Sequence, residues 1–129
     1  EYSHVCRLHH LYKEKQEMTI IDAIILEGIA EVIVRKKLGD DAGNQYIKKL
    51  NHDDFQRYWY RWIKGKETTT RHNPLHDKIM FGSYSMPKNL GYLLGYHLVH
   101  QYAEKHALSN KRLLYLENNE FLSILDETP

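Results

Sequence analysis

The sequence predicts an all-α domain, because apolar residues recur at helical spacing along most of the chain. Two further features support this fold class. Helix-capping residues precede the apolar segments, and the strongest loop formers concentrate in a single stretch, residues 64–87. The chain has 129 residues, of which 42% are hydrophobic, which is a single-domain length with enough apolar side chains for one core. We therefore expect one helical domain over residues 1–129.

The clearest predicted helix covers residues 19–38. Thr19 followed three residues later by Asp22 is typical of a capped helix start, and Gly39 is typical of a helix end. Isoleucine and valine are frequent here and would also suit a buried strand, but a length of about twenty residues favours a helix. Pro87 suits the first turn of a later helix. The other helices are expected over residues 1–16, 43–50, 51–63, 88–106, 109–116 and 118–126.

Composition excludes several classes of protein. With 18 basic and 17 acidic residues, the net charge of +1 gives no electrostatic case for a nucleic-acid partner. The longest purely apolar run, Ala23 to Leu26, is far too short to span a membrane. The single cysteine, Cys6, cannot form an internal disulfide, which fits a reducing compartment or a fold that needs no disulfides. We expect a cytoplasmic location. Nine histidines and ten tyrosines are many for this length, and they hint at chemistry.

The chain opens with EYSH, in which Glu1 and His4 share one face of a helix. With a histidine directly before Glu1, the stretch would form the zinc-protease motif H-E-x-x-H. In that motif two imidazoles one turn apart bind zinc, and the glutamate accepts a proton from water. Alone, E-x-x-H is a weak signal, because it also arises by chance on polar helices.

The segment LEGIAE, residues 26–31, places two carboxylates on the most apolar predicted helix. Carboxylates rarely lie in such surroundings unless they are paired or bind metal. Glu27 is therefore a candidate zinc ligand, because an antiparallel return would bring it back beside His4. Glu31 lies one turn further and could orient a histidine ligand through the second ring nitrogen. A polar stripe on an amphipathic helix is the alternative for both.

The segment GYLLGYH, residues 91–97, combines two glycines with polar aromatic residues. Gly91 and Gly95 would form a flat strip on a helix, against which another helix can pack closely. Tyr92, Tyr96 and His97 supply the polar aromatic side chains of this segment. A tight helix contact with tyrosines at its rim explains the same pattern. Three residues of the long loop could contact a substrate, although nothing assigns them a role: Arg71, His72 and His76.

In order, EYSHVCRL, LEGIAEVIV and GYLLGYHLV resemble a bacterial family of predicted zinc-dependent proteases, and the resemblance covers nearly the whole chain. That family is similar to the gluzincins, in which a glutamate from an E-G-x-A-type segment completes the zinc ligands of H-E-x-x-H. The resemblance implies that Glu1 is the general base. It implies in the same way that His4 and Glu27 are zinc ligands.

The resemblance also implies a residue downstream of the glutamate ligand that donates a hydrogen bond to the reaction oxyanion, and the candidates are Tyr92, Tyr96 and His97. It favours Tyr96 or His97 without separating them. The expected fold is then the helical C-terminal part of a gluzincin-like metalloprotease that acts on peptides. Because the first histidine ligand is not in this sequence, we expect the chain to begin inside the motif and to bind Zn²⁺ weakly by itself. The alternatives are a non-catalytic helical domain that binds a protein partner and a helical domain with a purely structural metal.

Overall fold

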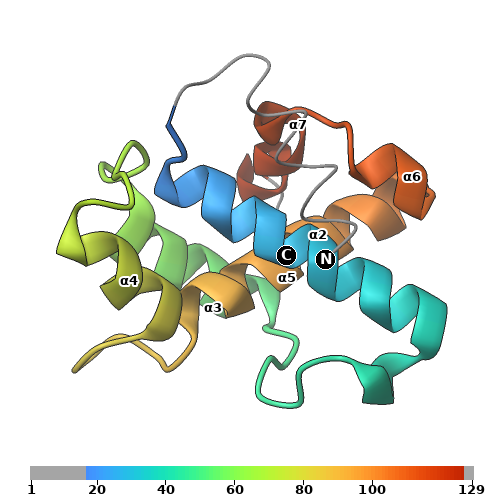
Figure 1. Cartoon of the computed structure of the whole chain (residues 1–129), viewed down its shortest axis with the longest axis horizontal. Helices are drawn as coiled ribbons and strands as arrows, with labels where there is room; N and C mark the ends of the chain where they lie inside the picture. Colours follow the sequence, from blue (N-terminus) through green and yellow to red (C-terminus); the bar gives the residue numbers. More distant parts are fainter. Residues whose placement is uncertain (1–16, 127–129) are drawn as a thin grey trace.

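Two long helices form the centre of the molecule, α2 (Ile20–Leu38) and α5 (Leu90–His106). They cross each other, and the shorter helices pack around them (Figure 1). The computed structural model describes residues 17–126, and every regular element in that range is helical, so the all-α prediction is confirmed. The shorter helices are α3 (His52–Tyr58), α4 (Pro74–Phe81), α6 (Asn110–Leu113) and α7 (Asn118–Leu122).

Helix α2 begins and ends where its capping residues predict. The Thr19 hydroxyl accepts a hydrogen bond from the Asp22 backbone N–H, while the Asp22 carboxylate accepts one from the Thr19 backbone N–H at 2.9 Å. Asp22 is buried, and its other oxygen accepts a 2.6 Å hydrogen bond from the Asn118 amide at the start of α7. At the opposite end Gly39 stops the helix with φ of +92°, a conformation that favours glycine. One capping carboxylate thus also joins the two ends of the described chain.

Glycines let α2 and α5 approach until their backbones touch. A side chain at Gly28 would collide with the carbonyl oxygen of Gly95, and one at Gly95 would collide with the carbonyl oxygen of Ile24. Gly91, one turn earlier on α5, lies in the same way against Met80 of α4. The flat strip predicted for α5 therefore receives a helix at each of its two glycines.

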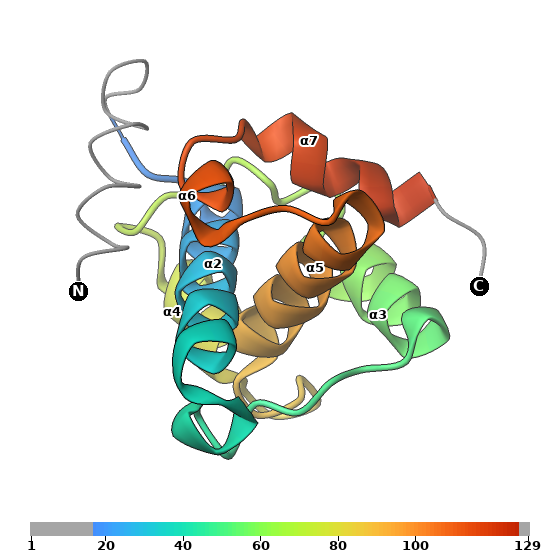
Figure 2. The same ribbon diagram turned by 90° about the vertical axis from the view of Figure 1, so that its right-hand side faces the viewer.

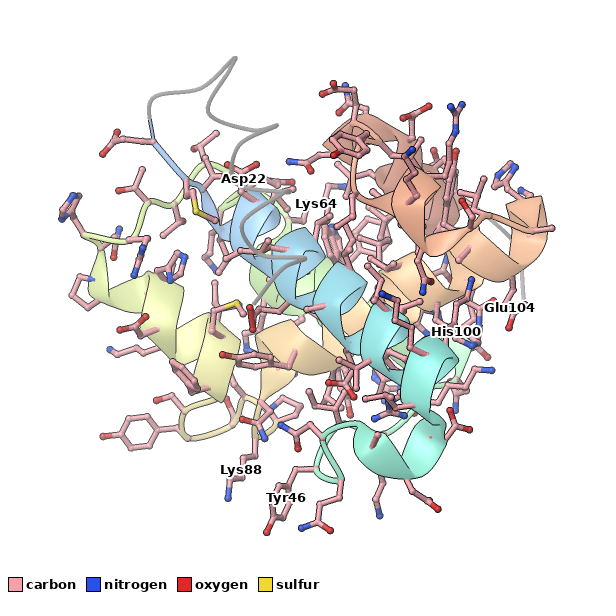
Figure 3. The ribbon with its side chains drawn as sticks, turned by 45° about the vertical axis from the view of Figure 1, so that its right-hand side comes forward. Asp22, Tyr46, Lys64, Lys88, His100 and Glu104 are labelled. Carbon is pink, nitrogen blue, oxygen red and sulfur yellow. The ribbon has the colours of Figure 1, made fainter. Side chains whose placement is uncertain are left out.

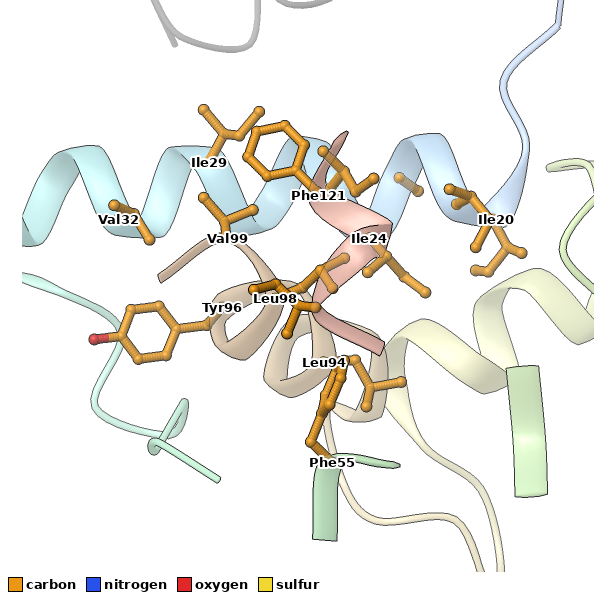
Figure 4. Packing of buried hydrophobic residues seen from close by; sticks show 14 of the residues in the cluster. Ile20, Ile24, Ile29, Val32, Phe55, Leu94, Tyr96, Leu98, Val99 and Phe121 are labelled. Atoms are coloured by element: carbon orange, nitrogen blue, oxygen red, sulfur yellow. The ribbon is translucent and has the colours of Figure 1, made fainter. Parts of the chain in front are cut away.

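The core extends to both sides of this crossing, as Figure 4 shows. Figure 2 shows that α5 lies between α2 and α3. Helix α2 is buried on more than one face, as its sequence indicates. The largest fully buried side chains come from α2, α3, α5 and α7 and from the segments near them: Ile20, Ile24, Ile25, Ile29, Phe55, Ile63, Ile79, Leu90, Leu94, Leu98 and Phe121.

The helix predicted for residues 43–50 is wrong. A short 3₁₀ turn, η1 (Asp40–Ala42), is followed by turns and extended chain. Side chains of α2 take over the backbone hydrogen bonds there: Glu31 accepts from the Asn44 N–H at 2.8 Å, and the Arg35 guanidinium donates to the Ile47 carbonyl at 2.7 Å. These contacts hold the segment against α2 without a helical ladder.

The long stretch 64–87 contains a helix that was not predicted, α4, with Asn73 as its N-cap and Pro74 in its first turn. The predicted helix 51–63 exists but changes from α3 to a π-helical turn, η2 (Trp59–Ile63). Helix α5 starts at Leu90, so Pro87 precedes it.

The last two predicted helices are shorter than expected. The helix predicted for 109–116 corresponds to α6, whose N-cap is Ser109. The helix predicted for 118–126 corresponds to α7 followed by a 3₁₀ turn, η3 (Ser123–Asp126). The helix predicted for 1–16 lies outside the described residues. Among residues 17–126, no helix has the length and apolar character needed to cross a bilayer.

Candidate functional site

A pocket of about 280 Å³ lies where α2, α4 and α5 meet. Figure 3 shows α4 beside the first half of α2, with side chains drawn between the two helices. The pocket wall is largely apolar, with a few polar groups set into it, which is the usual composition of a ligand site. Its lining residues are Met18, Ala23, Leu26, Glu27, Arg71, His76, Asp77, Met80, Phe81 and Tyr92.

Glu27 and Tyr92 reach this pocket from the two long helices. Burial raises the pKa of the Tyr92 phenol, and the nearby carboxylates of Glu27 and Asp77 raise it further. The phenol therefore stays protonated at neutral pH and can donate a hydrogen bond. Its ring also contacts that of Phe81, with centroids 5.7 Å apart, which helps to fix its orientation.

The glycine contacts place Tyr92 at the pocket. Gly91 brings α5 against α4, and Gly95 brings α5 against α2, so Tyr92 lies between the two contacts in the sequence and lines the space between the three helices. Gly28 follows Glu27 directly and is part of the same crossing. The close packing of the helices thereby sets the relative position of the carboxylate and the phenol.

His76 lines the same pocket and is 6% exposed. Its Nδ1 lies 3.4 Å from the Asp77 carboxylate, whereas its buried Nε2 has no hydrogen-bond partner among residues 17–126. Buried polar atoms are nearly always hydrogen-bonded in folded proteins, so this nitrogen needs an explanation.

Arg71 enters the pocket from the chain before α4. That chain is fixed to the start of α2 by an antiparallel bridge between Thr19 and Thr70 and by a 2.7 Å hydrogen bond from the Ile20 N–H to the Thr69 carbonyl. The two backbone contacts place Arg71, one residue beyond the bridge, at the pocket wall.

The two favoured oxyanion donors do not line this pocket. Tyr96 is 5% exposed and lies beneath the Arg35 guanidinium, whose central carbon is 4.3 Å from the ring centroid. In Figure 4 it lies near Val32, far along α2 from Ile20. Gly95, at which α2 crosses α5, lies between Tyr92 and Tyr96 in the sequence.

His97 points toward α3 instead. Its Nδ1 donates to the Leu50 carbonyl at 3.1 Å, its Nε2 lies 3.1 Å from Nδ1 of His52, and its ring stacks on Phe55 with centroids 4.3 Å apart. Burial lowers the pKa of His97 to about 4, and the neighbouring His52 contributes to the shift. The ring is therefore neutral at pH 7, and both of its nitrogens are used within the fold.

The candidate zinc ligands are only partly described. Glu27 lines the pocket, but Glu1 and His4 lie outside the described residues, so their roles remain predictions. Glu31 accepts hydrogen bonds from Arg35 at 2.7 Å and from Asn44, so it anchors the segment after α2. Within residues 17–126, no three His, Cys, Asp or Glu side chains are grouped as a metal site would require.

Sequence reasoning did not assign Arg71, His76 or Asp77 to this site. The sequence signal that indicates this part of the site is Asn73 followed by Pro74, which is typical of a helix start. A helix that starts there places His76 and Met80 one turn apart on the same face. Of the three loop residues noted from the sequence, His72 is exposed and does not line the pocket.

Comparison with known proteins identifies the family. Residues 1–123 match the family described as "Predicted Zn-dependent protease (DUF2268)". The chain belongs to this predicted zinc-dependent protease family. It is similar to two proteins of Bacillus subtilis (strain 168). It is 32% identical to the uncharacterized protein YjaZ over 125 residues, which is 97% of this chain and 48% of that protein.

The second relative is the uncharacterized protein YjfC, which is 22% identical over 132 residues, 95% of this chain and 44% of that protein. The chain thus spans about half the length of these relatives. No solved structure matches the chain.

Proposed function

We propose that this domain carries part of the active site of a zinc-dependent peptidase and that Glu27 is one of its zinc ligands. The observation that carries the proposal is the meeting of Glu27 and a protonated Tyr92 in one pocket. Membership of a family whose description predicts zinc-dependent proteolysis supports the same function.

Of the proposed zinc ligands, Glu27 lies among the described residues, and its chemistry suits zinc. Glu27 offers carboxylate oxygens, which are ordinary zinc ligands, but a catalytic zinc site needs three protein ligands. The resemblance assigns the others to His4 and to a histidine directly before Glu1. Bound zinc would acidify a water molecule and polarise the substrate carbonyl.

Each side chain then has a separate task. Glu1 would accept a proton from the attacking water and return it to the departing amine. The Tyr92 hydroxyl would donate a hydrogen bond to the carbonyl oxygen as negative charge develops on it. Burial and the Asp77 carboxylate hold the Tyr92 proton in place, because both oppose formation of a tyrosinate. We favour Tyr92 over Tyr96 and His97 because it lines the pocket with Glu27.

A peptidase assay with the full-length protein tests this function directly. We expect hydrolysis of a mixed set of peptides that stops when a chelator removes zinc, returns when zinc is restored, and disappears in Glu1→Gln. Circular dichroism would verify that the variant is folded. A full-length protein that binds no zinc, or a Glu1→Gln variant with normal peptidase activity, would contradict the proposal. The first result would leave a helical interaction domain as the better reading.

A further inference from the structure

We infer that His76 and Arg71 form a subsite for an acidic substrate side chain next to the bond that is cut. The inference rests on the proposed peptidase function and adds a substrate class to it. It starts from His76, which lines the pocket from α4 and whose buried Nε2 has no hydrogen-bond partner among residues 17–126. A buried polar atom without a partner is unfavourable, so a ligand that pairs with it binds more tightly.

Arg71 supplies the charge of this subsite. A guanidinium has five N–H donors and no acceptor. Within the described part of the chain, Arg35 and Arg57 form ion pairs with carboxylates, whereas no such ion pair is found for Arg71. The backbone bridge at Thr70 holds Arg71 at the pocket wall.

Two carboxylates also line the pocket and must be considered. Glu27 is the proposed zinc ligand, so its charge would be offset by the metal. Asp77 is at the rim, with its side chain 77% exposed, and it approaches His76 at Nδ1, the nitrogen on the other side of the ring from the unpaired one. Because a carboxylate only accepts, the contact with Asp77 places a proton on Nδ1, so Nε2 donates to a substrate carboxylate when the ring is an imidazolium.

The walls fit a side chain of medium length. Met18, Leu26 and Met80 can enclose methylene groups, and the two thioethers are flexible enough to move aside for a ligand. A glutamate side chain matches these features: its methylenes would contact the apolar wall, and its carboxylate would accept hydrogen bonds from Arg71 and His76.

Three peptides that differ only in the residue beside the cut bond test the subsite: glutamate, glutamine and methionine are nearly isosteric. The residue is varied on each side of that bond in turn, and cleavage is measured with the full-length, zinc-loaded protein. Hydrogen bonds to a charged group predict a kcat/KM for the glutamate peptide roughly tenfold or more above the methionine peptide, with glutamine between them. His76→Leu and Arg71→Gln should each bring this ratio toward one. His72→Leu is the matched control and should keep it. A wild-type ratio near one would overturn the inference while leaving the peptidase function intact.

A second readout does not depend on turnover. In NMR spectra of the full-length protein, N-acetylglutamate amide should shift the ring resonances of His76, and N-acetylmethionine amide should not. This difference would support the subsite even if no peptide were cut, a result that would count against the proposed function alone. Equal shifts, or none, would overturn the subsite. Because Arg71 is exposed, Arg71→Gln keeps the test valid if His76→Leu fails to fold.

Discussion

Helix α5 presents polar aromatic residues to two different surroundings. Toward α2 and α4, Tyr92 lines an open pocket with Glu27 and with a buried histidine nitrogen that has no described partner. Toward α3, His97 is sealed in the core, and its two nitrogens contact Leu50 and His52. The polar groups at the pocket can therefore still form hydrogen bonds to a ligand, whereas those of His97 already join elements of the fold.

The difference teaches that a buried polar residue signals function only when its partners are taken into account. In the sequence, Tyr92, Tyr96 and His97 are all candidate donors at neighbouring positions of one helix, and the resemblance favours Tyr96 or His97. The structure separates them by what each contacts: Tyr92 lines the pocket, Tyr96 lies against the Arg35 guanidinium, and His97 contacts the Leu50 carbonyl and the His52 ring. We therefore regard the α3 side as structural and the α4 side as the site.

The pair Tyr92→Phe and Tyr96→Phe tests this division most strongly. If Tyr92 donates to the oxyanion, removing its hydroxyl should lower kcat roughly 10²- to 10³-fold with little change in Tm. Tyr96→Phe removes the same atom outside the pocket and should keep kcat. Steady-state kinetics on the full-length protein measures both, and a larger loss in Tyr96→Phe would reverse the assignment.

The glycine crossing connects the two sides of α5, and Gly28→Ala should loosen it. The added methyl group would collide with the Gly95 carbonyl oxygen, a backbone atom that cannot rotate away. We expect a loss of about 3 kcal/mol in the free energy of unfolding, measured by urea titration. Lys37→Ala, at an exposed position of the same helix, should change it by less than about 0.5 kcal/mol. Equal effects would show that the crossing is not tight.

Acid should weaken the α3 side. Burial, with a contribution from His52, lowers the pKa of His97 in the folded protein to about 4 from an ordinary 6.5, so unfolding takes up a proton between these values. Stability is then complete above about pH 6.5 and falls as the pH drops toward 4, by up to about 3 kcal/mol.

The matched variant is His97→Asn, whose side-chain amide nitrogen takes the place of Nδ1 and can still donate a hydrogen bond to the Leu50 carbonyl. It should be less stable than the wild type near pH 7.5 but should lose less stability between pH 7.5 and 4.5. Urea titrations at several pH values measure this difference. An unchanged pH slope would mean that His97 is not the group that titrates.

Features that depend on residues close together in the sequence are predicted well, whereas features that depend on contacts between distant segments are not. The ends of α2 follow from local chemistry, and the Thr19, Asp22 and Gly39 signals predict them. The helix expected over 43–50 fails because distant side chains, Glu31 and Arg35, bind its backbone groups. Helix α4 was not predicted because its capping residues, Asn73 and Pro74, are also typical loop formers and lie among other loop formers.

The same limit applies to the site. The apolar surroundings of Glu27 are visible in the sequence, so its candidacy could be predicted. The choice of Tyr92 over Tyr96 could not, because it depends on where α2 crosses α5. The subsite of Arg71 and His76 depends further on the bridge between Thr19 and Thr70, a contact between segments about fifty residues apart in the sequence.

The most direct test of the central claim is the zinc content of the purified full-length protein and of two matched variants, Glu27→Gln and Glu31→Gln. Both replace a half-buried carboxylate on α2 by an amide of the same shape, but only Glu27 lines the pocket. We predict one zinc per molecule in the wild type and in Glu31→Gln, and a large loss of zinc in a folded Glu27→Gln. Full zinc binding by Glu27→Gln would contradict the account.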